Sequence, residues 1–138
     1  MVNLNDFQYD SKRSWYECKL EINGRFTGVY VCDEDTRDIE ILNDRLNKGI
    51  DWIENNYEKI LNYCADNLLE LKNESWLDLK EEEVTKQAFK EKLQLESIEI
   101  WDDGKLEISF RDGDLFDGHW IVADIDREYN LCDVNIEG

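Results

Sequence analysis

Alternating apolar and polar residues indicate two β-strands within residues 14–32. The dipeptide Asn23-Gly24 separates them, and it favours a tight type I′ turn because both central residues of that turn need a positive φ. A two-residue loop pairs residues whose numbers sum to 47, so Cys18 lies opposite Val29. One face of the predicted hairpin is then apolar and suited to burial: Tyr16, Cys18, Leu20, Ile22, Val29 and Val31.

The hydrophobic period changes to three or four residues between Asp35 and Leu71. This spacing predicts helix with one apolar stripe, and its short length between strands favours packing on a sheet over a coiled coil. The sequence Asn47-Lys48-Gly49 interrupts good helix formers, so we expect a kink there, or a break into two helices. The stripe consists of Ile39, Leu42, Leu46, Ile50, Ile53, Tyr57, Ile60, Cys64, Leu68 and Leu71.

A loop around Trp76, over residues 72–83, is expected to precede a short helix over residues 85–93 that Thr85 caps. After this helix, apolar and polar residues alternate again, which predicts further strands. A three-residue turn with Gly104 in the left-handed conformation pairs Ile100 with Leu106 and keeps the apolar face intact. Two more strands are predicted over residues 119–126 and 131–137, and a short strand near residues 7–9 extends the sheet.

These elements predict an α+β fold within a single globular domain, residues 1–138. An antiparallel sheet of about six strands, formed by an N-terminal hairpin and a C-terminal four-strand meander, packs against a long or kinked helix and a short helix. The length of 138 residues, with 41% hydrophobic and 12% aromatic residues, suits one hydrophobic core.

The charge balance narrows the classes of partner. The chain has 34 acidic and 16 basic residues and a net charge of −18. This excess disfavours nucleic acid and anionic membrane as ligands, whereas it permits a basic protein partner. There are two alternatives. The acidic residues serve only to keep the protein soluble, or they mimic nucleic acid, which requires regularly spaced carboxylates. The outer face of the helix over residues 50–71 would be the landing area for a basic partner: Asp51, Glu54, Glu58, Asp66 and Glu70.

The cysteines indicate a cellular compartment. Cys18, Cys32, Cys64 and Cys132 form no C-x-x-C pair, and zinc-finger spacings are absent. The first residues lack the basic region and apolar run of a signal peptide, and no apolar stretch reaches membrane-spanning length. We therefore expect a cytoplasmic protein with free, mostly buried thiols and no cofactor, although two disulfides in an exported protein are the alternative.

Candidate chemistry is concentrated between residues 112 and 120, where three carboxylates accompany the only histidine of the chain. A divalent metal is one hypothesis for this segment, because carboxylate oxygens and an imidazole are suitable ligands. The candidate ligands are Asp112, Asp114, Asp117 and His119. The segment does not match a calcium-binding EF-hand loop, since Phe116 occupies the fifth position and Ala123 the twelfth.

Catalysis is a second hypothesis for this segment, with His119 as the general base of a hydrolase, oriented by Asp117. The third and favoured hypothesis is structural: Asp and Gly build a turn, and a hydrogen bond from His119 fastens it. No nucleophile elbow, phosphate-binding loop or zinc-protease motif supports an enzyme. Trp76, Trp101 and Trp120 are expected to be buried, as Trp usually is, and Trp76 and Trp120 are the binding candidates if they are exposed.

Several segments together resemble a bacterial family catalogued as domain-of-unknown-function family 2262. They are NYCADNLLELKNESW at residues 62–76, FKEKLQLESI at 89–98, DGDLFDGHWIV at 112–122 and IEG at 136–138. The resemblance spans about residues 14–138, and Gly118-His119 is its most specific part, although Trp120 departs from the family's small residue. It implies a stand-alone bacterial cytoplasmic domain with no established activity and no known cofactor. By analogy, small acidic bacterial domains of this kind include immunity proteins that block toxins.

Overall fold

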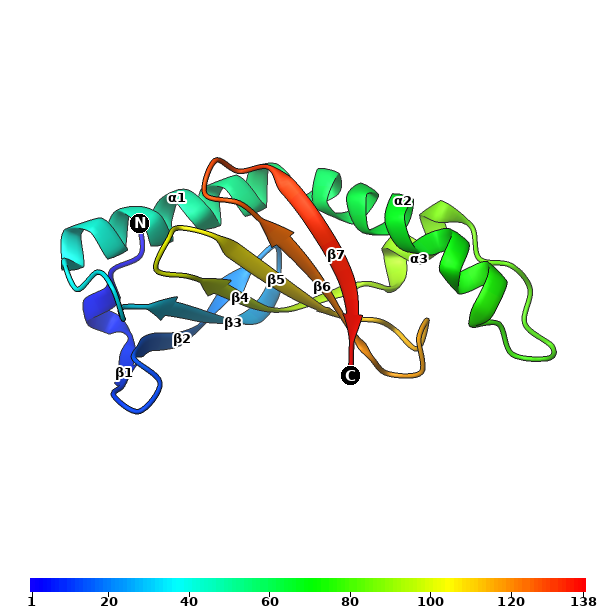
Figure 1. Ribbon diagram of the computed structural model, residues 1–138, viewed down its shortest axis with the longest axis horizontal. Helices are drawn as coiled ribbons and strands as arrows, with labels where there is room; N and C mark the ends of the chain where they lie inside the picture. The colour runs from blue at the N-terminus through cyan, green and yellow to red at the C-terminus, as the bar shows by residue number, and fades with distance from the viewer.

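A seven-stranded sheet with three helices on one of its faces forms the molecule (Figure 1). The computed structural model describes residues 1–138. The strands lie in the sheet in chain order: β1 (Gln8–Asp10), β2 (Trp15–Ile22), β3 (Arg25–Cys32), β4 (Gln94–Ile100), β5 (Leu106–Arg111), β6 (Trp120–Ile125) and β7 (Leu131–Glu137). The helices are the short 3-10 helix η1 (Leu4–Asp6), then α1 (Ile39–Asn55), α2 (Tyr57–Ser75) and α3 (Lys86–Lys92).

Both predicted turns and their registers are confirmed. In the β2–β3 hairpin Cys18 pairs with Val29, and Asn23 and Gly24 have φ angles of 50° and 82°. Between β4 and β5 Ile100 pairs with Leu106, while Gly104 has a φ of 88°. Positive φ at these turn positions matches the strand twist, which explains why local sequence was sufficient to set the pairing.

One feature of the sheet differs from the expectation. The sheet is mixed rather than antiparallel, because β3 and β4 pair in parallel, with Gly28 opposite Ser97. A parallel pair needs a crossover connection, and residues 33–93, including α1 to α3, provide it. The predicted short strand near residues 7–9 is confirmed as β1, and it brings the number of strands to seven. The C-terminal meander of β4 to β7 is confirmed.

The long helical region is two consecutive helices, but the predicted position of the break was wrong. The helices separate at Asn56, whose Nδ2 atom donates to the Trp52 carbonyl oxygen at 2.8 Å. Gly49 lies in the middle of α1 because that helix closely approaches the sheet: a Cβ atom there would be 3.3 Å from Leu106 Cδ2. Neither α1, α2 nor α3 combines the length and apolar character that crossing a membrane requires.

The loop after α2 begins later than expected, because α2 continues to Ser75. Buried Lys72 donates from Nζ to the Trp76 carbonyl oxygen at 2.6 Å and to a Glu81 carboxylate oxygen at 3.0 Å. Two hydrogen bonds join the Asn73 side chain to the backbone of Val84. The predicted cap of α3 is confirmed, since Thr85 Oγ1 accepts from the Ala88 amide at 3.1 Å.

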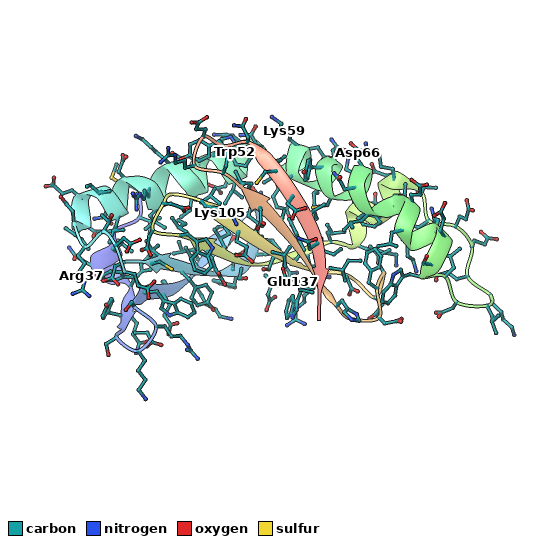
Figure 2. All side chains as sticks on the ribbon, viewed as in Figure 1. Arg37, Trp52, Lys59, Asp66, Lys105 and Glu137 are labelled. Atoms are coloured by element: carbon teal, nitrogen blue, oxygen red, sulfur yellow. The ribbon has the colours of Figure 1, made fainter.

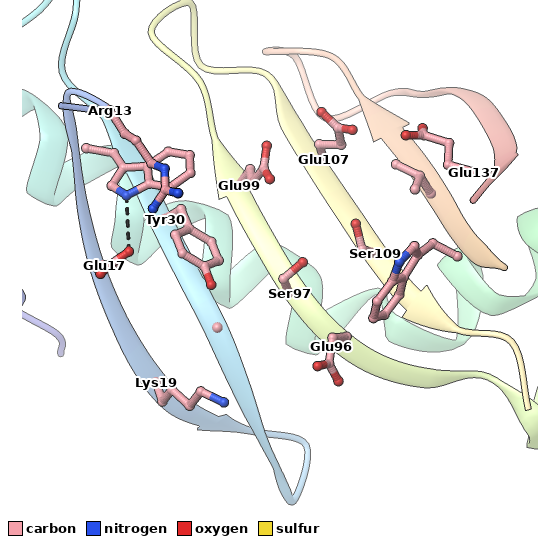
Figure 3. A pocket seen from close by; sticks show the side chains of 14 residues that line it. Arg13, Glu17, Lys19, Tyr30, Glu96, Ser97, Glu99, Glu107, Ser109 and Glu137 are labelled. Atoms are coloured by element: carbon pink, nitrogen blue, oxygen red, sulfur yellow. Dashed lines mark hydrogen bonds between the residues drawn. The ribbon is translucent and has the colours of Figure 1, made fainter. Parts of the chain in front are cut away.

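Alternate residues of strands β2 to β7 face the helices and contribute to the core, which is one cluster of 27 buried residues. The core side of the sheet meets α1 and α2 through contacts such as that of Tyr57 with Phe110. The other face of the sheet carries mostly polar and aromatic side chains, and no helix covers it (Figure 3). We call this surface the open face.

The close approach at Gly49 generates a prediction about stability. Gly49→Leu is expected to lower the free energy of unfolding by about 1–3 kcal/mol, because the larger side chain must displace Leu106 and Ile100. Gly49→Ala is the control and should stay within about 1 kcal/mol of the wild type, since better helix propensity offsets a small shift of Leu106. Urea unfolding measures both, and equal stability of the two variants would contradict this packing.

Candidate functional site

The loop that joins β5 to β6 is organised around the carboxylate of Asp112, which is only 3% exposed. Its Oδ1 atom accepts from the Asp114 amide at 2.9 Å. Its Oδ2 atom accepts from the amides of Phe116 and Gly118 at 2.8 and 3.1 Å. Three charge-assisted hydrogen bonds to one buried carboxylate hold the whole loop in shape.

His119 lies at the end of this loop and is half-buried. Its Nδ1 atom is 2.5 Å from the Phe116 carbonyl oxygen, and its ring meets the Trp76 ring edge-on at 5.5 Å between centroids. Gly138 lies against the Nε2 side of the same ring. His119 and Asp112 both line a small hollow of about 180 Å³ beside Trp120.

Of the other two predicted metal ligands, Asp114 lines the same hollow as Asp112 and His119, whereas Asp117 does not. Asp114 and Asp117 are exposed at left-handed turn positions, with φ angles of 66° and 55°. No three His, Cys, Asp or Glu side chains of the chain are arranged to hold a metal ion. Trp76 packs against Phe116 inside the loop, whereas Trp120 is 36% exposed on the open face, so its expected burial was wrong. The same holds for Trp101, at 37%.

A larger hollow of about 550 Å³ lies on the open face, over strands β2 to β7 (Figure 3). We call it the trench. Its floor is a row of small side chains on four neighbouring strands that pair directly with one another: Gly28, Ser97, Ser109 and Val122. The rows on either side carry Tyr, Glu, Arg and Trp, so the difference in side-chain size produces the depression.

Aromatic residues form two sides of the trench. On the β2–β3 side the rings of Trp15 and Tyr30 pack at 5.0 Å between centroids, and Arg13 lies 5.5 Å from the Trp15 ring. On the β6 side the guanidinium of Arg111 lies 5.1 Å from the centroid of Trp120. Aromatic rings with a cation nearby are typical of protein recognition surfaces.

Carboxylates form a row next to the floor. In the pairing register Glu99 lies opposite Glu107, Glu107 opposite Asp124, and Asp124 opposite Asp133. Like charges at directly opposed positions of a sheet repel one another. Only Lys105, 3.6 Å from Asp124, forms an ion pair with any of these four.

Burial and charge together shift the acidity of two members of this row. Burial, followed by the neighbouring carboxylates of Glu107 and Glu137, raises the pKa of Glu99. Burial and Asp124 raise the pKa of Glu107, against the lowering effect of a hydrogen bond from Trp101 Nε1 at 3.2 Å. The charged forms of Glu99 and Glu107 are therefore less favourable in this row than they would be in water.

Sequence reasoning missed the trench and its carboxylate row. Gly28, Ser97, Glu99 and Glu107 are ordinary outward-facing strand residues, and none belongs to a motif. The confirmed β4–β5 register already placed Glu99 beside Glu107. That like-charged pair is the signal that could have drawn attention to this surface.

The role of Asp112 is testable with a matched pair of substitutions. Asp112→Asn is expected to lower the free energy of unfolding by about 2 kcal/mol or more, because an amide group replaces an acceptor of backbone N–H bonds. Asp117→Asn, at an exposed position of the same loop, should change stability by less than about 0.5 kcal/mol. Thermal and urea unfolding measure both, and equal effects would contradict the role assigned to Asp112.

The repulsion within the carboxylate row predicts an unusual dependence on pH. A carboxyl group whose pKa is raised by folding destabilises the native state above that pKa, and the cost vanishes as pH falls below the ordinary pKa of Glu. Glu99→Gln should therefore stabilise the protein by about 0.5–1 kcal/mol near pH 8, and the gain should shrink towards about pH 4. Urea unfolding across this range is the measurement. Asp51→Asn, which removes one exposed carboxylate of α1 outside the row, is the control.

Comparison with known proteins places the chain in a family. No curated protein and no solved structure matches it. The sequence profile of one family, described as uncharacterised proteins conserved in bacteria, matches residues 2–136 and thus almost the entire chain. The chain therefore belongs to the bacterial family DUF2262.

Proposed function

We propose that this domain acts by binding a basic protein, and that the open face of the sheet is its binding surface. The observation that carries the proposal is the trench, which combines aromatic walls with a row of carboxylates on a face that no helix covers. Aromatic residues are enriched in the parts of protein surfaces that contribute most to binding. Clustered carboxylates supply the attraction that speeds association with a positively charged partner.

The helical surface expected earlier to receive a basic partner is a weaker candidate. Its carboxylates are exposed, and Figure 2 marks Asp66 together with Lys59 on α2. Two of the five already have a cation: Asp66 pairs with Lys86 at 2.6 Å, and Glu58 pairs with Lys90. Such pairs reduce the attraction that the helical surface offers to a partner.

The proposal includes an immunity-like role in the cytoplasm, in which the partner is a toxin that the domain blocks. Family membership supports a bacterial setting. The four cysteines are free thiols, and Cys132 is exposed, which accords with a reducing compartment. An immunity-like role implies that co-expression of the domain suppresses the toxicity of the partner.

Mimicry of nucleic acid is a second candidate that one observation favours. The carboxylates of Glu99, Glu107, Asp124 and Asp133 lie on consecutive strands, so they repeat regularly at about 4.8 Å, the spacing between strands. A partner recognised in this way would itself bind nucleic acid, and duplex DNA would displace it from the domain.

Hydrolysis at residues 112–119 is not part of the proposal. The Asp112 carboxylate already accepts three backbone N–H groups, and Nδ1 of His119 already contacts the Phe116 carbonyl oxygen. These contacts explain why both side chains are present: they stabilise the loop. No observation favours an enzyme there.

Capture from bacterial extract tests the proposal with two variants of equal charge change. Glu99→Gln with Glu107→Gln alters the open face, and Asp51→Asn with Glu54→Gln alters the helical surface. We expect the wild type and the helical variant to retain a basic protein that the open-face variant loses, with a roughly tenfold weaker Kd for the purified partner. Equal retention by both variants, or loss only with the helical variant, would contradict the proposal.

A further inference from the structure

We infer that the trench holds an arginine side chain of the basic partner, with its guanidinium between Glu99 and Glu107 and its aliphatic stem over Ser97 and Ser109. The inference rests on the proposed function and specifies what the open face recognises. Three observations support it: the uncompensated charge of the carboxylates, the shape of the floor, and the position of the aromatic walls.

Charge gives the first argument. Glu99 accepts no hydrogen bond and forms no ion pair within the chain, and the residue directly opposite it on β5 is another carboxylate, Glu107. Glu107 accepts one hydrogen bond, from Trp101. A half-buried pair of carboxylates with so few donors offers several free oxygens, which is the acceptor pattern that a planar, five-donor guanidinium satisfies.

The cations already present near the trench are engaged elsewhere or too distant. Lys105 pairs with Asp124, and Arg111 forms two hydrogen bonds to Glu96, at 3.0 and 3.2 Å. Arg13 pairs with Asp10 at 3.3 Å. Lys19 lies on β2, two strands from Glu99 and therefore about 10 Å away across the sheet. The chain thus provides no cation of its own for Glu99.

Shape gives the second argument. Ser97 and Ser109 are directly paired on β4 and β5. Each lies two residues along its strand from the glutamate on the same face, Glu99 or Glu107 (Figure 3). An arginine stem lying over these two small residues brings its guanidinium to the carboxylates without displacing any side chain. The depression has a volume of about 550 Å³, which exceeds that of one side chain and leaves room for neighbouring residues of the partner.

The aromatic walls give the third argument, and they favour arginine over lysine. The Tyr30 ring lies over Gly28 at the β3 end of the floor, and Trp120 lines the trench on β6. A guanidinium is planar and weakly hydrated, so it stacks on rings and binds paired carboxylates better than a compact ammonium does. Arg111 makes the same combination of contacts within the chain, because it lies over Trp120 and pairs with Glu96 at the same time.

Two synthetic peptides of equal charge test the inference directly: four Arg-Gly repeats and four Lys-Gly repeats, titrated calorimetrically at low ionic strength. We expect the arginine peptide to bind about tenfold more tightly to the wild type. Glu99→Gln with Glu107→Gln should remove this preference. Ser109→Tyr, which fills the floor without changing charge, should also remove it, whereas Ser109→Thr should retain it. Urea unfolding verifies that each variant is folded.

The outcomes separate this inference from the proposed function. Equal binding of both peptides, weakened equally in the Gln variant, would overturn the arginine inference and leave binding of a basic partner standing. Failure of both peptides to bind would also overturn it, and the capture experiment would then decide the proposed function alone. Calcium or magnesium chloride is a further probe: if either ion binds the wild type and the Gln variant loses that binding, the carboxylates belong to a metal instead.

Discussion

The single parallel junction between β3 and β4 determines the rest of this structure. Two parallel neighbours require a connection that crosses from one end of the sheet to the other. Because the other strand pairs are antiparallel and joined by turns or, between β5 and β6, by a loop without a helix, α1, α2 and α3 all fall within that one crossover and cover one face only (Figure 1). The opposite face is left open, and the junction itself, where Gly28 meets Ser97, lies at the floor of the trench.

Local chemistry explains which parts of the fold were predictable. Asn23-Gly24 and Gly104 impose positive φ at tight turns, so the registers of both hairpins followed from sequence. The pairing of β3 with β4 depends on packing across more than 60 residues and has no local signal. Gly49 illustrates the same limit. Its lack of a side chain lets α1 pack closely against Leu106 in the sheet, and the helix does not end there. The helix instead ends at Asn56, where the side chain bonds to the Trp52 carbonyl oxygen.

The two candidate sites differ in the same way. The segment from Asp112 to His119 has a composition typical of catalytic and metal-binding sites. Its most buried carboxylate, that of Asp112, nevertheless accepts hydrogen bonds from three backbone amides of its own loop. The trench has no distinctive composition. Its floor and its acidic row are assembled from separate strands, so they exist only once the registers of β3 to β6 are combined. Contiguous motifs were visible in the sequence, and surfaces assembled across strands were not.

The acidic row also reaches the free edge of the sheet. A seven-residue edge strand such as β7 presents unpaired backbone groups, which invite pairing with a second molecule and growth into extended aggregates. Asp133 and Glu137 stand on this edge strand, so two copies that met there would bring their carboxylates together without a counterion. Electrostatic repulsion between the carboxylates of two such copies opposes association through the β7 edge.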